Sequence, residues 1–376
     1  MTLPNLNHFH SVMAFEAQVA QYLYCLFLCK LEPESSLYPA LLALPASIIG
    51  ECQWMASVIY EAFTHPISFR WSSHEYALDL GKQTGMNCKK EEEMEALFPP
   101  LFTGDLPICK DPFVIVDSTG MVLMWQLPSL LCWSRQMAMF CAALSLNPLM
   151  RTSGKPQVPG KCGSWRNDPA YFKAPSGQYK VTPGVLNFSP AWFQLGHQGP
   201  ASSLGVSATL NAKARLLGTD QWLNDTIHST AIVNAILRVI HPRLYAYGRR
   251  GREALLADGM DMNWLSIYTG AAVISNRETP VHRDTQCWVG WYDLLVSAGP
   301  YRYAEMVLPS IGIRTPDLPG TLSALSGHTL PHGVSEADGE RVCYAFFMRH
   351  KVSQRLGLRL AEPMMADHYL RARRSV

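Results

Sequence analysis

Residues 327–347 read GHTLPHGVSEADGERVCYAFF, two short runs of strand-forming residues joined by a polar turn. Outward from this stretch, the chain after residue 264 breaks into further short apolar runs separated by Gly, Pro and Asp. The strands that we expect are 266–275, 286–297, 303–308, 320–325, 331–335 and 341–349. Short strands at this spacing are typical of a sandwich or a barrel.

A metal site is indicated by His282 and Asp284, which form the only His-x-Asp pair in the chain. On an extended segment, residues i and i+2 project from the same face, so the imidazole and the carboxylate can bind one ion. A second imidazole comes from His332, 332 − 284 = 48 residues after Asp284. Two histidines and one carboxylate are the ligands of non-haem Fe(II) oxygenases. His328 competes with His332 for the third position, and Pro331, which holds its neighbour extended, favours His332.

An anion site is indicated by Arg341, which begins the apolar run 342–347. A guanidinium buried in such a strand needs a negative partner. Its planar fork of donors suits the far carboxylate of a dicarboxylic oxo-acid. The alternative is an ordinary ion pair with Glu336 or Asp338. Together, His-x-Asp, a later His and Arg341 predict a site for iron and an oxo-acid.

Three segments, 276–284, 327–334 and 339–341, together resemble the TET/JBP family of 2-oxoglutarate dioxygenases, and the short fungal TET-like proteins in particular. The resemblance implies an α+β fold with a double-stranded β-helix (jelly-roll) core flanked by helices and a largely helical N-terminal elaboration. It also implies Fe(II), 2-oxoglutarate as co-substrate and O2.

The same resemblance assigns roles to individual positions. The metal and catalytic roles fall on His282, Asp284 and His332. Contacts to the oxo-acid fall on Arg341 and Arg277. Substrate contacts fall on His350 and Asp338 for the base and on Arg349 for base or phosphate.

The substrate that the resemblance implies is a methylated base flipped out of DNA. Family members oxidise 5-methylcytosine to its hydroxymethyl, formyl and carboxyl forms, and some fungal relatives also demethylate N6-methyladenine. Methylated DNA is then the partner, and nuclear localisation is expected from that substrate alone. This chain lacks the cysteine-rich and CXXC-type regions of animal members, so CpG selectivity does not follow. The alternatives are an oxygenase acting on RNA, protein or a small molecule, and an inactive nucleic-acid-binding scaffold.

The remaining sequence predicts how the chain is organised. A composition of 48% hydrophobic and 16% charged residues excludes a disordered protein. In the N-terminal part we expect helices at 11–31, 36–63 and 133–146 and a hairpin at 113–125, and in the core a supporting helix at 221–240. The predicted regions are a helical elaboration at 1–148, a basic loop-rich segment at 149–205, the dioxygenase core at 206–360 and a basic tail at 361–376.

The overall charge does not indicate a partner, because the net charge is only +2. The basic segment 151–180 and the cluster Arg249–Arg252 are interpreted either as phosphate contacts or as solvated loops. Residues 12–31 are apolar enough to be tested as a membrane span, but Glu16 and two glutamines favour a buried amphipathic helix. We therefore expect no membrane association, free thiols in a reducing compartment and no obligate protein partner.

Overall fold

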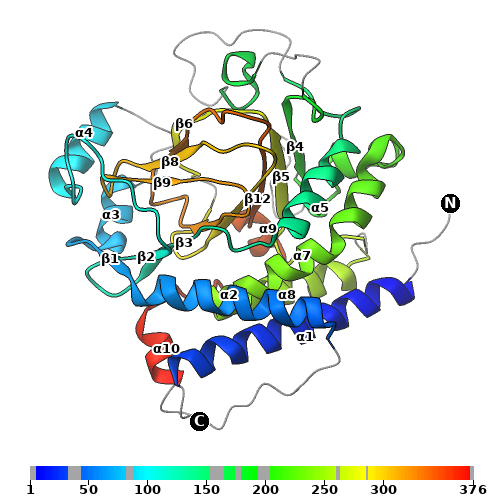
Figure 1. Ribbon diagram of the computed structural model, residues 1–376, viewed down its shortest axis with the longest axis horizontal. Helices are drawn as coiled ribbons and strands as arrows, with labels where there is room; N and C mark the ends of the chain where they lie inside the picture. The colour runs from blue at the N-terminus through cyan, green and yellow to red at the C-terminus, as the bar shows by residue number, and fades with distance from the viewer. Residues whose placement is uncertain are drawn as a thin grey trace.

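Two β-sheets packed against each other form the core of the computed structural model (Figure 1). The structure describes residues 6–32, 44–81, 88–152, 165–173, 179–193, 204–259, 263–284 and 287–372. The larger sheet has the order β1-β2-β3-β10-β7-β12-β5-β4, and the smaller one has the order β6-β11-β8-β9. All described strand pairings are antiparallel except β1 with β2. This is the jelly-roll core expected for the chain.

The bounds of the strands locate the two sheets in the sequence. The larger sheet contains β1 (Pro66–Ser68), β2 (Phe113–Val116), β3 (Val122–Leu127), β4 (Gly184–Phe188), β5 (Gly270–Ser275), β7 (Asp293–Ala298), β10 (Leu322–Leu325) and β12 (Val342–Phe347). The smaller sheet contains β6 (Thr279–His282), β8 (Glu305–Leu308), β9 (Ile313–Pro316) and β11 (His332–Val334). The six predicted strands are present with shorter bounds, whereas β1, β4, β6 and β9 were not predicted because they are short and mixed in polarity.

Helices cover the outer face of the larger sheet (Figure 1). This layer consists of α1 (Leu6–Leu31), α2 (Ala46–Thr64), α5 (Trp133–Leu144), α7 (Asp220–Ile240) and α8 (Pro242–Ala257). The shorter helices are α3 (Ser73–Leu80), α4 (Cys88–Leu97), α6 (Ala212–Ala214), α9 (His350–Arg355) and α10 (Asp367–Ala372). One apolar core lies between the helices and the larger sheet, and a second lies between the sheets around Leu123, Met306 and Ile313.

The predicted hairpin at 113–125 is confirmed, because β2 and β3 pair antiparallel across the turn 117–120. The Asp117 carboxylate accepts hydrogen bonds from the backbone N–H groups of Thr119 and Met121, both at 2.9 Å. Gly120 has φ of 85°, a conformation that favours glycine. The predicted helix 36–63 is shorter, beginning at Ala46, and part of its predicted start lies outside the described residues.

Pro242 ends α7 as predicted, but a second helix begins at the same residue and was not predicted. Proline suits the first turn of a helix, where its missing N–H costs nothing. The His241 side chain caps this helix by accepting the Leu244 N–H at 3.1 Å. The interpretation of Arg249–Arg252 as a loop is therefore wrong, and Arg252 is buried in an ion pair with Glu16 at 2.8 Å.

The buried Glu16 belongs to α1, the one described helix long and apolar enough to cross a membrane by length and composition. About two-fifths of its apolar window, 39%, is buried within the protein. The helix packs against α2 and α7, and Glu16 also accepts a hydrogen bond from Asn234 at 2.9 Å. These contacts are those of a helix in a folded core.

Candidate metal centre

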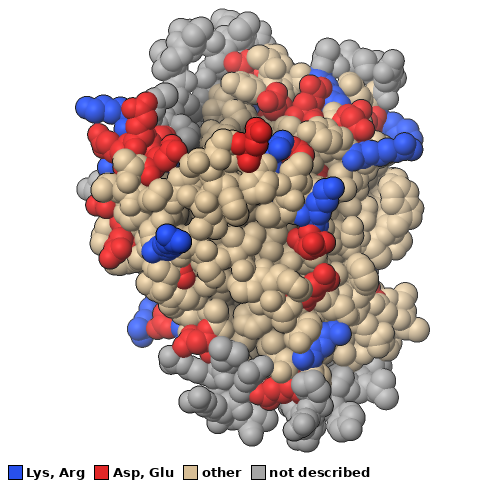
Figure 2. All heavy atoms as spheres, turned by 60° about the vertical axis from the view of Figure 1, so that its left-hand side comes forward, with Lys and Arg blue, Asp and Glu red and all other residues tan. Residues whose placement is uncertain are grey.

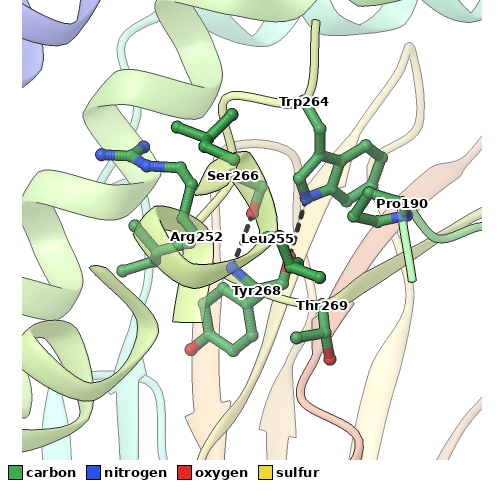
Figure 3. A pocket seen from close by; sticks show the side chains of 9 residues that line it. Pro190, Arg252, Leu255, Trp264, Ser266, Tyr268 and Thr269 are labelled. Atoms are coloured by element: carbon green, nitrogen blue, oxygen red, sulfur yellow. Dashed lines mark hydrogen bonds between the residues drawn. The ribbon is translucent and has the colours of Figure 1, made fainter. Parts of the chain in front are cut away.

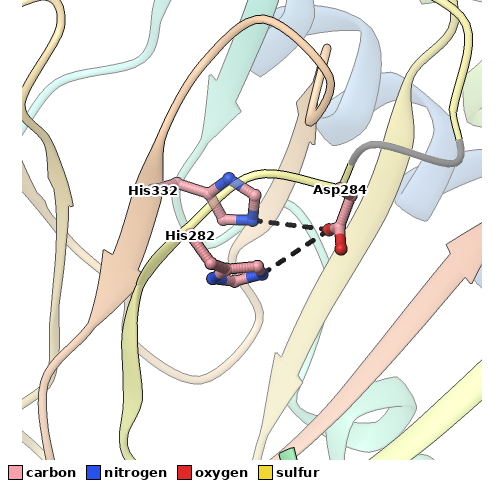
Figure 4. A group of neighbouring side chains, drawn as sticks. All are labelled: His282, Asp284 and His332. Carbon is pink, nitrogen blue, oxygen red and sulfur yellow. Dashed lines mark ion pairs between the residues drawn. The ribbon is translucent and has the colours of Figure 1, made fainter. Parts of the chain in front are cut away.

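His282 and His332 are direct neighbours across strands β6 and β11 of the smaller sheet. Asp284 lies two residues after His282, just past the end of β6. One ligand atom from each of the three residues lies within 4.8 Å of the others, and the side chains converge on one point (Figure 4). The Asp284 Oδ2 atom is 3.6 Å from His282 Nε2 and 3.8 Å from His332 Nε2. The structure thus brings the predicted triad together, with His332 rather than His328 in third place.

Backbone carbonyls orient both imidazole rings. His282 Nδ1 lies 3.0 Å from the Pro280 carbonyl, and His332 Nδ1 lies 3.0 Å from the Leu330 carbonyl. An N–H on Nδ1 that donates to a carbonyl leaves the Nε2 lone pair facing the centre. Burial, and next the neighbouring His282, lowers the pKa of His332 to about 4, so this ring is neutral near pH 7.

Asp284 supplies the negative charge of the centre. Burial alone would raise its pKa, but the hydrogen bond and charge of His282, together with His332 and Arg166, hold the pKa of Asp284 below its ordinary value. Two imidazoles and one carboxylate are the donor set of mononuclear non-haem Fe(II) centres, in which three positions stay open for other ligands. The residues present therefore fit Fe(II).

Gly327 allows a close approach of two segments at the metal centre. Its carbonyl accepts the Asp284 N–H at 2.8 Å. A Cβ atom at this position would lie 2.7 Å from Asp293 Oδ2 and 3.2 Å from the Cβ of Asp284. The glycine in the 327–334 motif is thus required by space, because no side chain fits between these carboxylates.

Arg341 is buried and already has an acidic partner, Asp317. Its Nε and Nη2 atoms lie 2.9 and 2.5 Å from Asp317 Oδ2, and Nη2 also donates to Ser297 Oγ at 3.2 Å. The alternative pairing of Arg341 with Glu336 or Asp338 is wrong, because its ion-pair partner is Asp317. The described contacts of Arg341 use Nε and Nη2. The role of Arg341 toward the oxo-acid stays a prediction.

Arg277 is the second predicted oxo-acid contact, and it is buried with 6% of its surface exposed. Its Nη1 donates to the Arg166 carbonyl at 3.0 Å, and within the described residues its Nε has no hydrogen-bond partner. Burial lowers the pKa of Arg277 to about 10. A buried guanidinium with an unsatisfied donor calls for an anion, and a carboxylate of 2-oxoglutarate is such a group.

The segment 165–173 places aromatic and basic groups over the metal centre. The Trp165 ring lies 4.7 Å from the His282 ring, and the guanidinium of Arg277 lies 4.9 Å from the Trp165 ring. Arg166 Nη2 donates to Asp284 Oδ1 at 2.9 Å. Arg166 had been assigned to a basic segment for phosphate contact or solvent, but it reaches the metal ligand instead.

The three predicted substrate contacts are placed differently. The His350 ring lies 5.2 Å from the Trp288 ring. Trp288 directly follows a turn that begins at Asp284. The Arg349 guanidinium lies 3.8 Å from the centre of the Trp192 ring and is partly buried. Asp338 is exposed and accepts the backbone N–H groups of Arg302 at 2.8 Å and Tyr303 at 2.9 Å. This contact caps a loop, and no described contact joins Asp338 to the metal triad.

A separate small pocket lies between α8 and the segment that precedes β5 (Figure 3). Its lining includes Arg252, Leu255, Trp264, Ser266, Tyr268 and Thr269. Two of its polar side chains are engaged, since Trp264 Nε1 donates to the Tyr268 carbonyl at 2.8 Å and Arg252 is paired with Glu16. No member of the triad lines this pocket, so it is separate from the metal centre.

Several functional neighbours were missed at the level of sequence. Asp317 lies 24 residues from its partner Arg341, and Arg166 lies 118 residues from Asp284. The expected strand 286–297 contains Trp288, Trp291 and Tyr292, and all three are predicted to lie in the barrel core, yet 39% of the Trp288 surface is exposed. Its neighbours Trp291 and Tyr292 are buried as predicted. A polar Arg-Asp-Thr-Gln run directly before Cys287 and Trp288 is the signal that this aromatic side chain lies at an edge.

One family model matches the part of the chain that contains the metal triad. Residues 192–350 match the Tet_JBP family model, described as the oxygenase domain of the 2OGFeDO superfamily. No curated protein matches the chain. Among solved structures, NgTET1 in complex with 5mC DNA is 14% identical with a TM-score of 0.47, covering 73% of this chain and 89% of that one.

Two further solved structures are more distant. The rice dioxygenase for auxin oxidation is 14% identical with a TM-score of 0.28, covering 68% of this chain and 86% of that one. A full-length Neurospora crassa protein in complex with alpha-KG is 12% identical with a TM-score of 0.28, covering 65% of this chain and 83% of that one. At these values the likenesses say nothing about the substrate of this chain.

Proposed function

This protein carries a TET/JBP-like oxygenase domain and is a dioxygenase that depends on Fe(II) and 2-oxoglutarate, and on that premise we propose that it oxidises the methyl group of 5-methylcytosine in DNA. Bound Fe(II) with 2-oxoglutarate supplies the oxidising chemistry: one atom of O2 enters a methyl C–H bond, and the other leaves in succinate, with release of CO2. The first product is 5-hydroxymethylcytosine, and further rounds give the formyl and carboxyl forms.

The observation that supports a base as substrate is an exposed aromatic surface beside Asp284. The backbone N–H of Cys287 bonds to the Asp284 carbonyl at 3.1 Å, which places the next residue, Trp288, within one turn of the metal ligand. Its indole is 39% exposed and meets the His350 ring at 35°. A target base must leave the duplex to reach such a centre. Once flipped out, its flat face can stack on an indole.

Polar groups next to this aromatic surface offer hydrogen bonds to the polar edge of a base. His350 is partly buried, and burial lowers its pKa, so its ring is neutral at pH 7 and offers one donor and one acceptor. The Cys287 thiol donates to the buried Asp293 carboxyl at 3.0 Å. Burial, and next the charge of Asp284, raises the pKa of Asp293.

Surface charge limits where a duplex can lie. Figure 2 shows acidic side chains gathered over α4, in which Glu92, Glu93 and Glu95 are exposed. That face repels a phosphate backbone. Three basic side chains elsewhere in the described chain are exposed, namely Arg151, Lys180 and Lys213. We propose that they contact the phosphate backbone.

N6-methyladenine is the second base in this proposal. Hydroxylation of its methyl group gives an N-hydroxymethyl product, which releases formaldehyde and leaves adenine. The exposed indole accepts a purine or a pyrimidine face, because every base has a π surface. From the proposed DNA substrate alone we propose a nuclear location, and imaging of the tagged chain tests it.

The experiment is mass spectrometry of nucleosides from duplex DNA that carries both methylated bases, incubated with protein, Fe(II), ascorbate and O2. Oxidised cytosine, or loss of the adenine methyl group, should require 2-oxoglutarate and disappear in Asp284→Ala. If both bases stay intact while 2-oxoglutarate is converted to succinate, the substrate is RNA, protein or a small molecule. If neither reaction occurs and the purified protein binds no Fe(II), the protein is a scaffold.

A further inference from the structure

Arg283 lies between the metal ligands His282 and Asp284 and points away from the metal. Side chains alternate along an extended segment, so the residue between two ligands faces the opposite side. Only 1% of the Arg283 side chain is exposed. Its fork binds the Glu91 carboxylate of α4, with Nη2 at 2.7 Å from Oε2 and Nη1 on Oε1. Nη2 also donates to the Tyr76 hydroxyl of α3.

Tyr76, one of the two residues that receive Arg283, is itself firmly held. The Tyr76 ring stacks on Trp71 at 4.8 Å and meets the edge of Phe98 at 5.2 Å. The helix that carries Tyr76 is tied to the larger sheet by Ser73, whose backbone N–H donates to Asp117 at 2.9 Å. The Arg283 contacts therefore connect the metal-binding segment to a rigid part of the N-terminal region and not to a loose loop.

This anchoring matters because Asp284 lies beyond the end of β6. On one side, the Asp284 N–H is bonded to the Gly327 carbonyl. On the other side, the preceding residue is fixed by Glu91 and Tyr76. A two-pronged ion pair between the buried Arg283 and the partly buried Glu91 fixes orientation as well as distance.

We propose that Glu91 and Tyr76 are positioning residues for the metal centre, so that the N-terminal helices α3 and α4 set the affinity of the triad for Fe(II). Outer partners that orient metal ligands change metal affinity when they are removed, typically by roughly 10–100-fold. Here the partner acts through the backbone between the two ligands. The Glu91 charge thus has a function at the metal centre, although the sequence around it predicts a solvated helix face.

The test measures metal binding by Glu91→Gln, which keeps the shape of the side chain and removes its charge. Without O2, its dissociation constant for Fe(II) or Mn(II) should rise roughly 10–100-fold, and the visible absorption of the complex with Fe(II) and 2-oxoglutarate should shift or weaken. Tyr76→Phe keeps the ring packing and loses one hydrogen bond, so it should fold normally and weaken metal binding less.

The matched control is Glu51→Gln, which breaks a similar two-pronged pair with Arg135 in the helical layer. It should lower thermal stability and leave metal affinity within about twofold of wild type, since no described contact joins that pair to the triad. Unchanged metal affinity in both Glu91→Gln and Tyr76→Phe would overturn the proposal and make the Arg283 contacts purely structural. Because the readout is metal binding, the result is independent of the DNA substrate.

Discussion

Arg341 and Asp317 form an ion pair in which the two residues expose 4% and 2% of their surface. Ser297 completes the arrangement, because its hydroxyl donates to the Asp317 carboxylate at 2.9 Å and accepts from Arg341. The arginine predicted to receive the far carboxylate of 2-oxoglutarate is thus oriented by a carboxylate of the protein. If Arg341 binds the oxo-acid as predicted, that carboxylate meets a guanidinium whose charge Asp317 already neutralises.

Asp317→Asn should lower the free energy of unfolding of the protein. 2-Oxoglutarate should then stabilise the variant more than it stabilises the wild type. Loss of one partner of a buried ion pair costs about 3–5 kcal/mol, because the other charge stays buried. Bound 2-oxoglutarate would then supply the missing negative charge. Thermal unfolding with Mn(II), with and without 2-oxoglutarate, checks both effects. Equal stability of variant and wild type without the oxo-acid would contradict the role given to this pair.

Gly327→Ala should weaken metal binding, because the new methyl group would meet Asp293 Oδ2 at 2.7 Å and displace the Asp284 segment. The matched control is Gly50→Ala in α2, where a Cβ atom meets nothing within 4 Å. In a helix that change should stabilise the protein by about 0.5–1 kcal/mol. Titration with Fe(II) under anaerobic conditions separates the two, and wild-type affinity in Gly327→Ala would show that the close approach is unimportant.

Trp288→Ala should raise the KM for methylated DNA and leave the affinity for Fe(II) unchanged. Loss of one base-stacking side chain costs about 1–3 kcal/mol, which is roughly 5- to 150-fold in binding. Trp133→Ala is the control, because this tryptophan of α5 is 65% exposed and its removal should not affect DNA. Steady-state kinetics on a methylated duplex checks the prediction, and equal KM values for both variants would exclude Trp288 as the stacking surface.

His241→Asn should lose less free energy of unfolding than the wild type as the pH falls from 7 to 4. The buried His241 ring accepts the Leu244 N–H at Nδ1, and burial lowers its pKa from 6.5 to about 4. The unfolded chain therefore binds the proton more readily, so this group's contribution is present above pH 6.5 and is lost as pH falls toward 4. Asparagine keeps the cap acceptor. Urea unfolding between pH 4 and 7 should show a flatter profile, and an identical slope would refute the assignment.

The metal triad could be predicted from sequence because two of its ligands are close in the chain and the third lies in a recognisable motif. His282 and Asp284 are two residues apart on an extended segment, and His332 begins a strand that the pattern also predicts. Asp317 and Glu91 could not be found in this way, because tertiary folding alone brings them to Arg341 and Arg283. Residues 89–93, which read KKEEE and include Glu91, are indistinguishable in sequence from the solvated face of a helix. The helix after Pro242 was missed because proline both ends and begins helices.

The measurement that tests the central claim most directly is the ratio of succinate to oxidised base formed by purified protein on duplex DNA with 5-methylcytosine. The account predicts one succinate for each oxidation step in wild type and neither product in Asp284→Ala. Succinate formed at the same rate with methylated and unmethylated DNA, and no oxidised cytosine, would contradict the claim that the triad acts on a methylated base.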